Sequence, residues 1–145
     1  FFLIIYIIMH KNFIHKVKVY YEDTDLGGVV YHANYLKFFE RARTEALITL
    51  GFSNKKIKDI FKVIIVVKSC RIDYKKPAYL EDELLVKSFV KSTTKASLLM
   101  SQQISNKEDL IAEATIHLVF INEKSKPIKI PEILLEYFKP YTEIN

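Results

Sequence analysis

The spacing of hydrophobic residues along the chain predicts one strand, then one long helix, then a run of strands. Around Val17 and Val19, in residues 15–22, apolar side chains recur two positions apart, which is the period of a half-buried strand. From Tyr35 onward they recur at intervals that place them on one helical stripe. This helix should end at Gly51, because glycine commonly follows the last residue of a helix. The expected stripe consists of Tyr35, Phe38, Phe39, Ala42, Ala46 and Leu50.

Strand-forming composition dominates the next part of the chain, after a short segment at residues 54–60 that is compatible with a helix. Polar, turn-forming breaks divide it into four predicted strands. These are residues 62–74, 83–92, 97–105 and 110–122. Pro131 then begins a short helix that runs to about Phe138, because proline fits the first turn of a helix.

This order of elements predicts an α+β fold, with a long antiparallel sheet of about five strands around one central helix and a short C-terminal helix. We expect the last four strands to pair in meander order. The long helix can bury its stripe only by lying across the concave face of the sheet. Such a sheet keeps an exposed edge and an uncovered outer face, so we expect the chain to associate as a homodimer or homotetramer.

Length and composition fit a single globular domain. The chain has 145 residues, 50% of them hydrophobic, with only 3 Gly and 4 Pro, which argues against a disordered or fibrous protein. Lys and Arg number 22 against 17 Asp and Glu, and the formal charge of +5 favours anionic partners without naming one.

The two ends of the chain differ in character. We assign residues 11–145 to the single domain and residues 1–10 to an apolar N-terminal extension, which is too short to span a bilayer. We expect Met9 to be the natural first residue, because a polar segment follows it directly. Mass spectrometry of the native protein tests this, and an N-terminal peptide containing Phe1 or Phe2 would contradict it.

The single cysteine, Cys70, cannot form an intrachain disulfide. It lies in an apolar run beside Val66 and Val67, so we expect a buried, unreactive thiol in a strand. No Cys and His residues occur at the spacing of a zinc site, and we expect no metal.

The segment between the first strand and the long helix, residues 20–35, carries the candidate chemistry. Adjacent glycines, Gly27 and Gly28, let the backbone approach a ligand closely, and the helix start offers unpaired N–H groups that stabilise an oxyanion. Acyl transfer suits such a site, with Asp25 as nucleophile or general base and His32 nearby. Taken alone, Asp25 also fits a turn or a helix cap, and His32 also fits a structural histidine.

The same segment resembles the signature of a known family. Residues 21–32 read YEDTDLGGVVYH and are continued by residues 34–36, NYL, and residues 39–43, FERAR. This run is similar to the YbgC-type acyl-CoA thioesterases of the 4-hydroxybenzoyl-CoA thioesterase family, which have the hotdog fold. The resemblance implies a sheet wrapped around the central helix, dimers that join their sheets edge to edge, and tetramers built from them. It places the catalytic carboxylate on Asp25 and a second functional residue on His32.

The resemblance implies that the reaction is hydrolysis of a thioester to a carboxylic acid and a thiol. A thiolate leaves readily, since a free thiol has a pKa of about 8.5, so one carboxylate and backbone donors suffice without a cofactor. Coenzyme A is then part of the substrate. We expect N–H groups near Tyr31 and His32 to bind the oxyanion and Gly28 to lie close to the substrate. The acyl chain would enter beside Tyr35 and Phe39, although packing in the core explains these rings equally well.

The phosphates of coenzyme A need basic partners. Lys91 and Lys95, at a predicted hairpin, are our candidates, although solvated surface lysines are the alternative interpretation. The resemblance also implies a cytoplasmic enzyme near the inner membrane, linked to the Tol-Pal system, with acyl carrier protein as a partner.

Other functions stay open on the sequence alone. One is a hotdog protein that binds acyl-CoA or acyl carrier protein without hydrolysing it, and intact Asp25 and His32 argue against this. Another is a small basic nucleic-acid-binding domain, but the chain has no RNA-binding motif and its positive charge is spread, so we expect no nucleic-acid partner. A hotdog dehydratase would need a different pairing of His and Glu.

Overall fold

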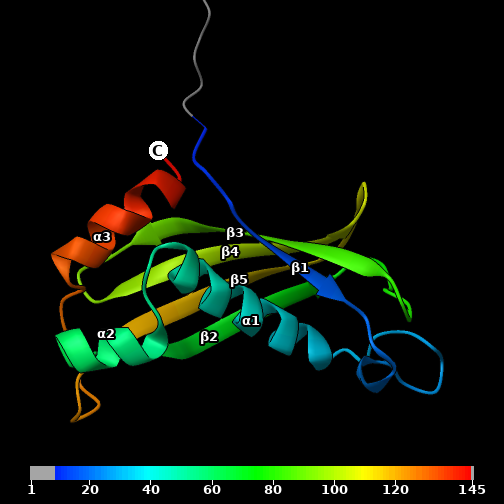
Figure 1. Ribbon diagram of the computed structural model, residues 1–145, viewed down its shortest axis with the longest axis horizontal. Coiled ribbons are helices and arrows are strands. Elements are labelled where there is room, and N and C mark those ends of the chain that lie inside the picture. The colour runs from blue at the N-terminus through cyan, green and yellow to red at the C-terminus, as the bar shows by residue number, and fades with distance from the viewer. Residues whose placement is uncertain (1–8, 145) are drawn as a thin grey trace, which may run out of the picture.

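The computed structural model describes residues 9–144, and they form a five-stranded antiparallel sheet with one long helix across its face (Figure 1). The strands are β1 (Phe13–Lys18), β2 (Ile64–Tyr74), β3 (Glu83–Thr93), β4 (Ser97–Asn106) and β5 (Asp109–Ile121). The helices are α1 (Asn34–Thr49), α2 (Asn54–Phe61) and α3 (Glu132–Phe138), and two 3-10 turns lie at Tyr21–Asp23 and Lys139–Tyr141. The predicted α+β fold is confirmed. Of the predicted N-terminal extension, residues 1–8 lie outside the described residues.

One apolar stripe holds α1 against the sheet. Its buried residues are Tyr35, Phe38, Phe39, Ala42, Ala46 and Leu47. The stripe is the predicted one except that Leu47 takes the place of Leu50, which caps the helix. Phe52 N–H donates to the Leu47 carbonyl at 2.9 Å and Gly51 N–H donates to the Ile48 carbonyl at 2.9 Å. This Schellman motif needs the left-handed φ of +85° that Gly51 supplies. None of the helices described is both long and apolar enough to cross a membrane.

The strand order differs from the expected meander. Only β3, β4 and β5 follow one another, whereas β2 pairs with β5 at the far edge, so the order is β1-β3-β4-β5-β2. The two helices explain the difference. β1 and β2 run in the same direction, so α1, whose 16 residues span about 24 Å, returns the chain along the strands. α2, which packs on β2, then leads the chain to the far edge of the sheet beside β5.

The first strand is shorter than predicted. β1 ends at Lys18, and Tyr21–Asp23 form a 3-10 turn in place of the strand's last residues. The Asp23 carboxylate accepts a hydrogen bond from Tyr20 N–H at 2.9 Å, and Asp23 N–H donates to the Tyr20 carbonyl at 3.0 Å. These local bonds compete with strand pairing and turn the chain toward α1.

A β-bulge in β2 determines where Cys70 lies. The register with β5 shifts between Val67 and Ser69, so one extra residue changes the phase of side-chain alternation. Val67 and Cys70 consequently line the same open groove between β2 and α1. Cys70 is exposed, and the predicted burial is wrong because β2 is an edge strand that the described part of the chain leaves uncovered. Desolvation by the groove raises the pKa of the thiol above its ordinary value.

A buried polar network crosses the contact between α1 and the sheet. Gln102, on β4, is fully buried, and its Nε2 donates to the Phe39 carbonyl and to the Ser88 hydroxyl, both at 3.0 Å. Its Oε1 accepts from Arg43 Nη1 at 3.0 Å. Burial lowers the pKa of Arg43, although an arginine stays charged. One side chain therefore connects α1, β3 and β4.

The substitution Gln102→Leu tests this connection. Leucine keeps the volume but leaves the Arg43 guanidinium and the Phe39 carbonyl without their partner, so we expect a loss of about 2 kcal/mol in the free energy of unfolding. The exposed neighbour provides the control, since Gln103→Leu should change that free energy by less than about 0.5 kcal/mol. Urea denaturation measures both variants, and equal stabilities would contradict a role for the network.

Candidate active site

The carboxylate of Asp25 lies at the exposed tip of a tight turn between β1 and α1. Asp25 N–H donates to the Val29 carbonyl at 2.9 Å, and Gly28 N–H donates to the Asp25 carbonyl at 3.0 Å. Asp25 Oδ1 accepts a hydrogen bond from Gly27 N–H at 2.8 Å. One carboxylate oxygen is thus held by the backbone, while the side chain as a whole is open to solvent and to a substrate.

The two glycines of this turn have different structural roles. Gly28 adopts a φ of +77°, which a residue with a side chain rarely adopts, and the turn needs that conformation. Gly27 has no such φ, but a Cβ atom there would lie 3.2 Å from Asp25 Oδ1. Gly27 therefore leaves room for the carboxylate, and Gly28 shapes the backbone that carries it.

Asp23 connects the turn to the start of α1. It is buried, and its carboxylate is bonded to Tyr20 N–H. Its carbonyl accepts from Tyr31 N–H at 2.9 Å and from Asn34 Nδ2 at 2.9 Å. The two aspartates of the Asp-Thr-Asp run therefore differ, since Asp23 joins the turn to the helix start and Asp25 is left available for chemistry.

His32 lies two residues before α1. None of the described residues accepts a hydrogen bond from its N–H, whereas the Tyr31 N–H is engaged by the Asp23 carbonyl. Of this expected pair of oxyanion donors, His32 N–H is the available one. The His32 ring is exposed and lies edge-on to the Tyr31 ring, with centroids 4.6 Å apart. The Tyr74 hydroxyl donates to the His32 carbonyl at 3.1 Å.

Tyr35 lies in the hydrophobic core. It is 3% exposed, its hydroxyl accepts from Ala78 N–H at 3.3 Å, and its ring packs against Phe38 and Tyr74. Burial raises its pKa, so it stays neutral. Phe39 is fully buried as well. Both rings pack α1 onto the sheet, and the expectation that the acyl chain enters beside them stays a prediction.

The predicted phosphate-binding lysines lie far from Asp25 in the same chain. β3 begins beside the turn, since Val19 N–H donates to the Asp82 carbonyl at 2.9 Å. Lys91 is exposed eight residues after Glu83, and eight residues of strand span roughly 26 Å. Lys95 is exposed in the hairpin beyond it. The fold therefore does not bring Lys91 or Lys95 to the turn.

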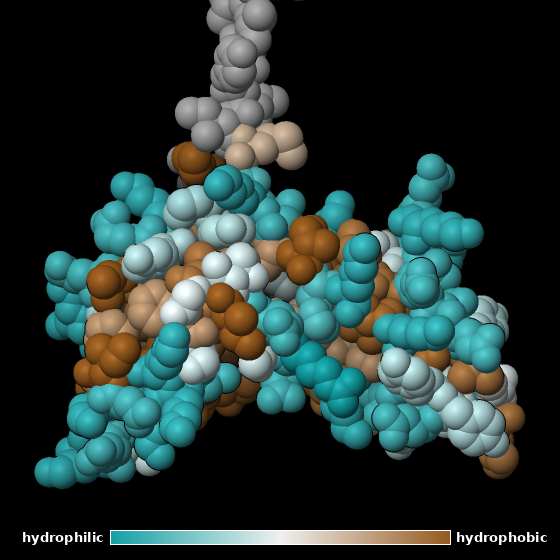
Figure 2. All heavy atoms as spheres, in the orientation of Figure 1, coloured by the Kyte–Doolittle hydropathy of each residue, from teal (hydrophilic) through white to brown (hydrophobic). Residues whose placement is uncertain are grey.

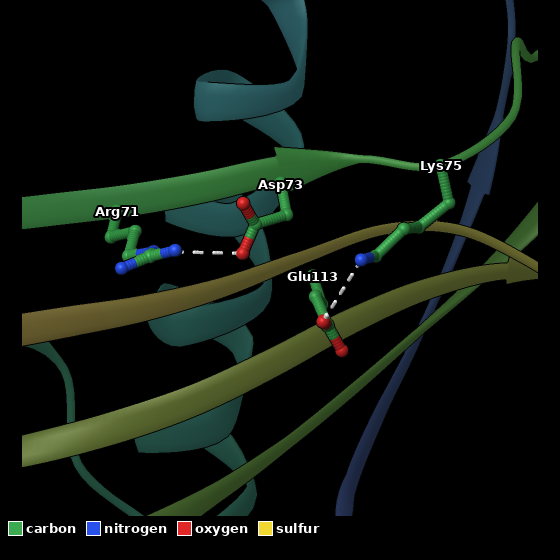
Figure 3. Close-up of polar contacts among 4 residues, drawn as sticks. All are labelled: Arg71, Asp73, Lys75 and Glu113. Atoms are coloured by element: carbon green, nitrogen blue, oxygen red, sulfur yellow. Dashed lines mark ion pairs between the residues drawn. The ribbon is translucent and has the colours of Figure 1, made fainter.

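Basic residues in and after β2 form ion pairs with nearby carboxylates. Lys75 Nζ lies 3.7 Å from Glu113 Oε1, and Arg71 Nε lies 3.6 Å from Asp73 Oδ2 (Figure 3). Lys76 Nζ lies 2.8 Å from Asp109 Oδ1. Exposed pairs of this kind add at most about 1 kcal/mol each to stability. Within residues 9–144, no group of three or more His, Cys, Asp or Glu side chains is arranged to hold a metal ion.

Comparison with known proteins identifies the family. A sequence profile described as the thioesterase-like superfamily matches residues 19–138. The chain belongs to this superfamily. It is 41% identical over 125 residues to the acyl-CoA thioesterase YbgC of Haemophilus influenzae, which covers 86% of this chain and 92% of that relative. The family expected from the sequence motif is thereby confirmed.

Solved structures of other thioesterases share the fold. A probable thioesterase from Bartonella henselae superposes with a TM-score of 0.80 at 35% identity, over 83% of this chain and 100% of that one. A 1,4-dihydroxy-2-naphthoyl-CoA thioesterase from Synechocystis superposes with a TM-score of 0.82 at 26% identity, over 89% of this chain and 96% of that one. The hotdog arrangement of sheet and central helix is confirmed.

Two supports of the site in this thioesterase were not singled out from the sequence. Tyr74 reaches the His32 carbonyl from the end of β2, and the Ala78 carbonyl accepts from Val30 N–H at 2.8 Å. In the sequence, the only indication of the role of Tyr74 is that an aromatic residue stands directly before a polar break. The role of the Ala78 carbonyl has no sequence signal, because every residue has a backbone carbonyl. Both contacts join residues more than forty positions apart, which local patterns do not report.

Alanine substitutions at Gly27 and Gly28 test their two structural roles separately. In Gly27→Ala the new Cβ atom displaces the Asp25 carboxylate, so we expect thioester turnover to fall roughly ten- to hundredfold with little change in stability. In Gly28→Ala the positive φ costs about 1 kcal/mol of unfolding free energy. Turnover assays and urea denaturation measure both effects, and full activity in Gly27→Ala would contradict this account of the turn.

Proposed function

We propose that this protein hydrolyses acyl-CoA thioesters at Asp25. The observation that carries the proposal is the exposed Asp25 carboxylate, held at Oδ1 by Gly27 N–H in the turn just before the N-terminus of α1. The names of the relatives supply the substrate class, since those of Haemophilus influenzae and Helicobacter pylori are called acyl-CoA thioesterases.

In the proposed mechanism, the thioester carbonyl oxygen lies at the start of α1. His32 N–H and the positive end of the helix dipole stabilise the negative charge that develops there. The Asp25 carboxylate either attacks the carbonyl carbon or removes a proton from an attacking water, and both routes require its charge and a free oxygen. The thiolate of coenzyme A then leaves without a strong general acid.

We also propose the finer setting that the family resemblance implies. This is a cytoplasmic enzyme close to the inner membrane, associated with the Tol-Pal system, with acyl carrier protein as a partner. The formal charge of +5 supports anionic partners such as coenzyme A, an acidic carrier protein and a membrane surface.

The substitution Asp25→Asn tests the catalytic assignment. It removes the charge but preserves the shape, so we expect thiol release from a panel of acyl-CoAs to fall at least a hundredfold. Glu22→Gln is the matched control, because it makes the same change at an exposed residue three positions earlier and should keep turnover within twofold. A folded wild-type protein that binds acyl-CoA without releasing thiol would instead be the non-catalytic binding protein.

We propose a homodimer that joins two copies through β2. β2 has a free edge of 11 residues, and its apolar residues Ile64 and Val67 are 38% and 50% exposed. In the orientation of Figure 1, β2 runs along the lower margin, and Figure 2 shows that this margin is hollowed between the α2 end and the turn at Asp25. The opposite edge, β1, has 6 residues and carries exposed Lys16 and Lys18, which discourage pairing.

A carboxylate on the free edge tests this interface. Val67→Asp places like charges on both copies near the middle of the paired strands, so we expect the mass measured by light scattering to fall from dimer to monomer. Ile14→Asp is the control, because Ile14 is 53% exposed on the other edge of the sheet. A dimer that survives Val67→Asp but dissociates in Ile14→Asp would place the interface on β1.

A further inference from the structure

A groove of about 630 Å³ lies along the first strand of the sheet, and we call it the β1 groove. It is lined by residues of β1, by the start of β3 and by Arg41 of α1. Leu85 faces the outer side of the sheet, because its neighbours Leu84 and Val86 are buried in the core, whereas Arg41 belongs to the helix on the inner side. The groove therefore passes around the free edge of β1.

The backbone at this edge has unused hydrogen-bonding groups. Just after β1, Val19 N–H donates to the Asp82 carbonyl at 2.9 Å, so the backbone groups of Val19 face the β3 side. Successive residues of a strand direct these groups to opposite sides, and those of Ile14, Lys16 and Lys18 therefore point away from β3. No strand of the described residues pairs with them there. The edge thus offers a row of donors and acceptors to an added strand.

Basic side chains surround the β1 groove. Lys16, Lys18 and Arg41 are exposed, and within residues 9–144 none of them forms an ion pair. The carboxylate in the lining is that of Glu83, which lies opposite Lys18 in the sheet. An acidic partner is attracted by this charge, whereas a second copy of β1 would bring lysines against lysines. The edge is therefore suited to an acidic segment and not to its own copy.

The pleat of the sheet decides where the side chains of an added strand lie. In an antiparallel pair, two residues that exchange backbone hydrogen bonds lie directly opposite each other, with their side chains on the same face. A residue bonded to Lys16 or Lys18 thus has its side chain on the outer face beside the lysine. The residues between point inward, to the side of Val17 and α1. Carboxylates are favoured at every second position, with apolar residues between them.

We propose that β1 binds an extended acidic segment of another protein, which adds to the sheet as an antiparallel strand with carboxylates at alternate positions. β1 has 6 residues, so a segment of about six residues, or roughly 20 Å, covers it. In strand addition the backbone hydrogen bonds supply affinity, and the side chains supply the sequence preference. The inference goes beyond thioester hydrolysis and requires only that β1 is free, as it is in a β2 dimer.

Reversal of two charges tests the preference for carboxylates. The probe is a fluorescein-labelled peptide of eight residues that alternates Glu and Val, and its Kd for the full chain is measured by fluorescence anisotropy. We expect the double variant Lys16→Glu, Lys18→Glu to raise the Kd at least tenfold, because attractive pairs become repulsive. Urea denaturation shows whether the variant is folded.

The double variant Lys124→Glu, Lys126→Glu is the matched control. These two lysines have the same spacing, are exposed and lie outside the β1 groove, so the Kd should stay within twofold of wild type. Equal weakening by both double variants would reveal a general effect of net charge and would overturn the proposal.

Methylated peptides test strand addition on the wild-type protein. N-methyl groups on the Glu amides remove the donors that face β1, so we expect the Kd to rise at least tenfold. The same groups on the Val amides point away from β1 and should change the Kd less than threefold. Equal binding of the two methylated peptides would contradict antiparallel pairing.

Amide hydrogen exchange gives a second measurement on the wild-type protein. The amides of Ile14, Lys16 and Lys18 should exchange rapidly in the free protein and at least tenfold more slowly with saturating peptide. The amides of Phe13 and Val17, which face β3, should change little. Slow exchange at the first three amides without peptide would mean that the edge is already covered, and it would overturn the proposal.

Two other occupants of the edge give different results. Vesicles of phosphatidylglycerol that bind more tightly than the peptide, and that release the Lys16→Glu, Lys18→Glu variant, would assign these lysines to a lipid surface and overturn the proposal. Dissociation of the dimer by Ile14→Asp would place a second copy on β1, with the same consequence. Thiol release enters none of these measurements, so a failure here leaves the proposed function in place.

Discussion

The packing of α1 against the concave face of the sheet is the contact on which the other features depend. This packing buries the apolar stripe of the helix. Gln102 adds hydrogen bonds to Phe39 and Ser88, and hydrogen bonds, unlike aliphatic contacts, depend on direction. An apolar helix face tolerates small shifts, whereas a buried amide with fixed partners favours one position. The helix start, with Asn34 bonded to the Asp23 carbonyl, then has a defined place relative to the turn.

Sequence patterns predict the elements of this fold well where the physical cause is local. The stripe of α1, its end at Gly51 and the four later strands all follow from periodicity and turn chemistry within a few residues. The order of strands depends on where α1 and α2 lead the chain after β1. The exposure of Cys70 depends on a bulge in β2 and on the absence of a covering neighbour among the described residues. These are long-range properties, so a local pattern misses them.

The candidate site shows the same division. The motif predicts Asp25 and His32 as site residues, and the turn geometry explains why the first aspartate of the run is buried and the second is exposed. The motif does not show whether the ring of Tyr35 is buried or lies at the surface, because an aromatic residue on a helix stripe suits either place. In the structure this ring is buried. The motif also does not show where Lys91 and Lys95 lie relative to the Asp25 turn, because their distance from it depends on the length and direction of β3.

The hydrogen bond from Tyr74 to the His32 carbonyl connects the segment before α1, which follows the Asp25 turn, to the edge strand β2. In a single chain β2 has a strand partner on one side only, and such a strand opens locally at a lower free energy than the whole domain unfolds. Opening at the end of β2 would break this bond to the backbone just before α1, although the bonds of Tyr31 and Asn34 to the Asp23 carbonyl would remain. Local order at the start of α1 is therefore linked to the pairing of β2, which the proposed homodimer would complete. Amide hydrogen exchange and thermal melting would report on two different properties of the same molecule.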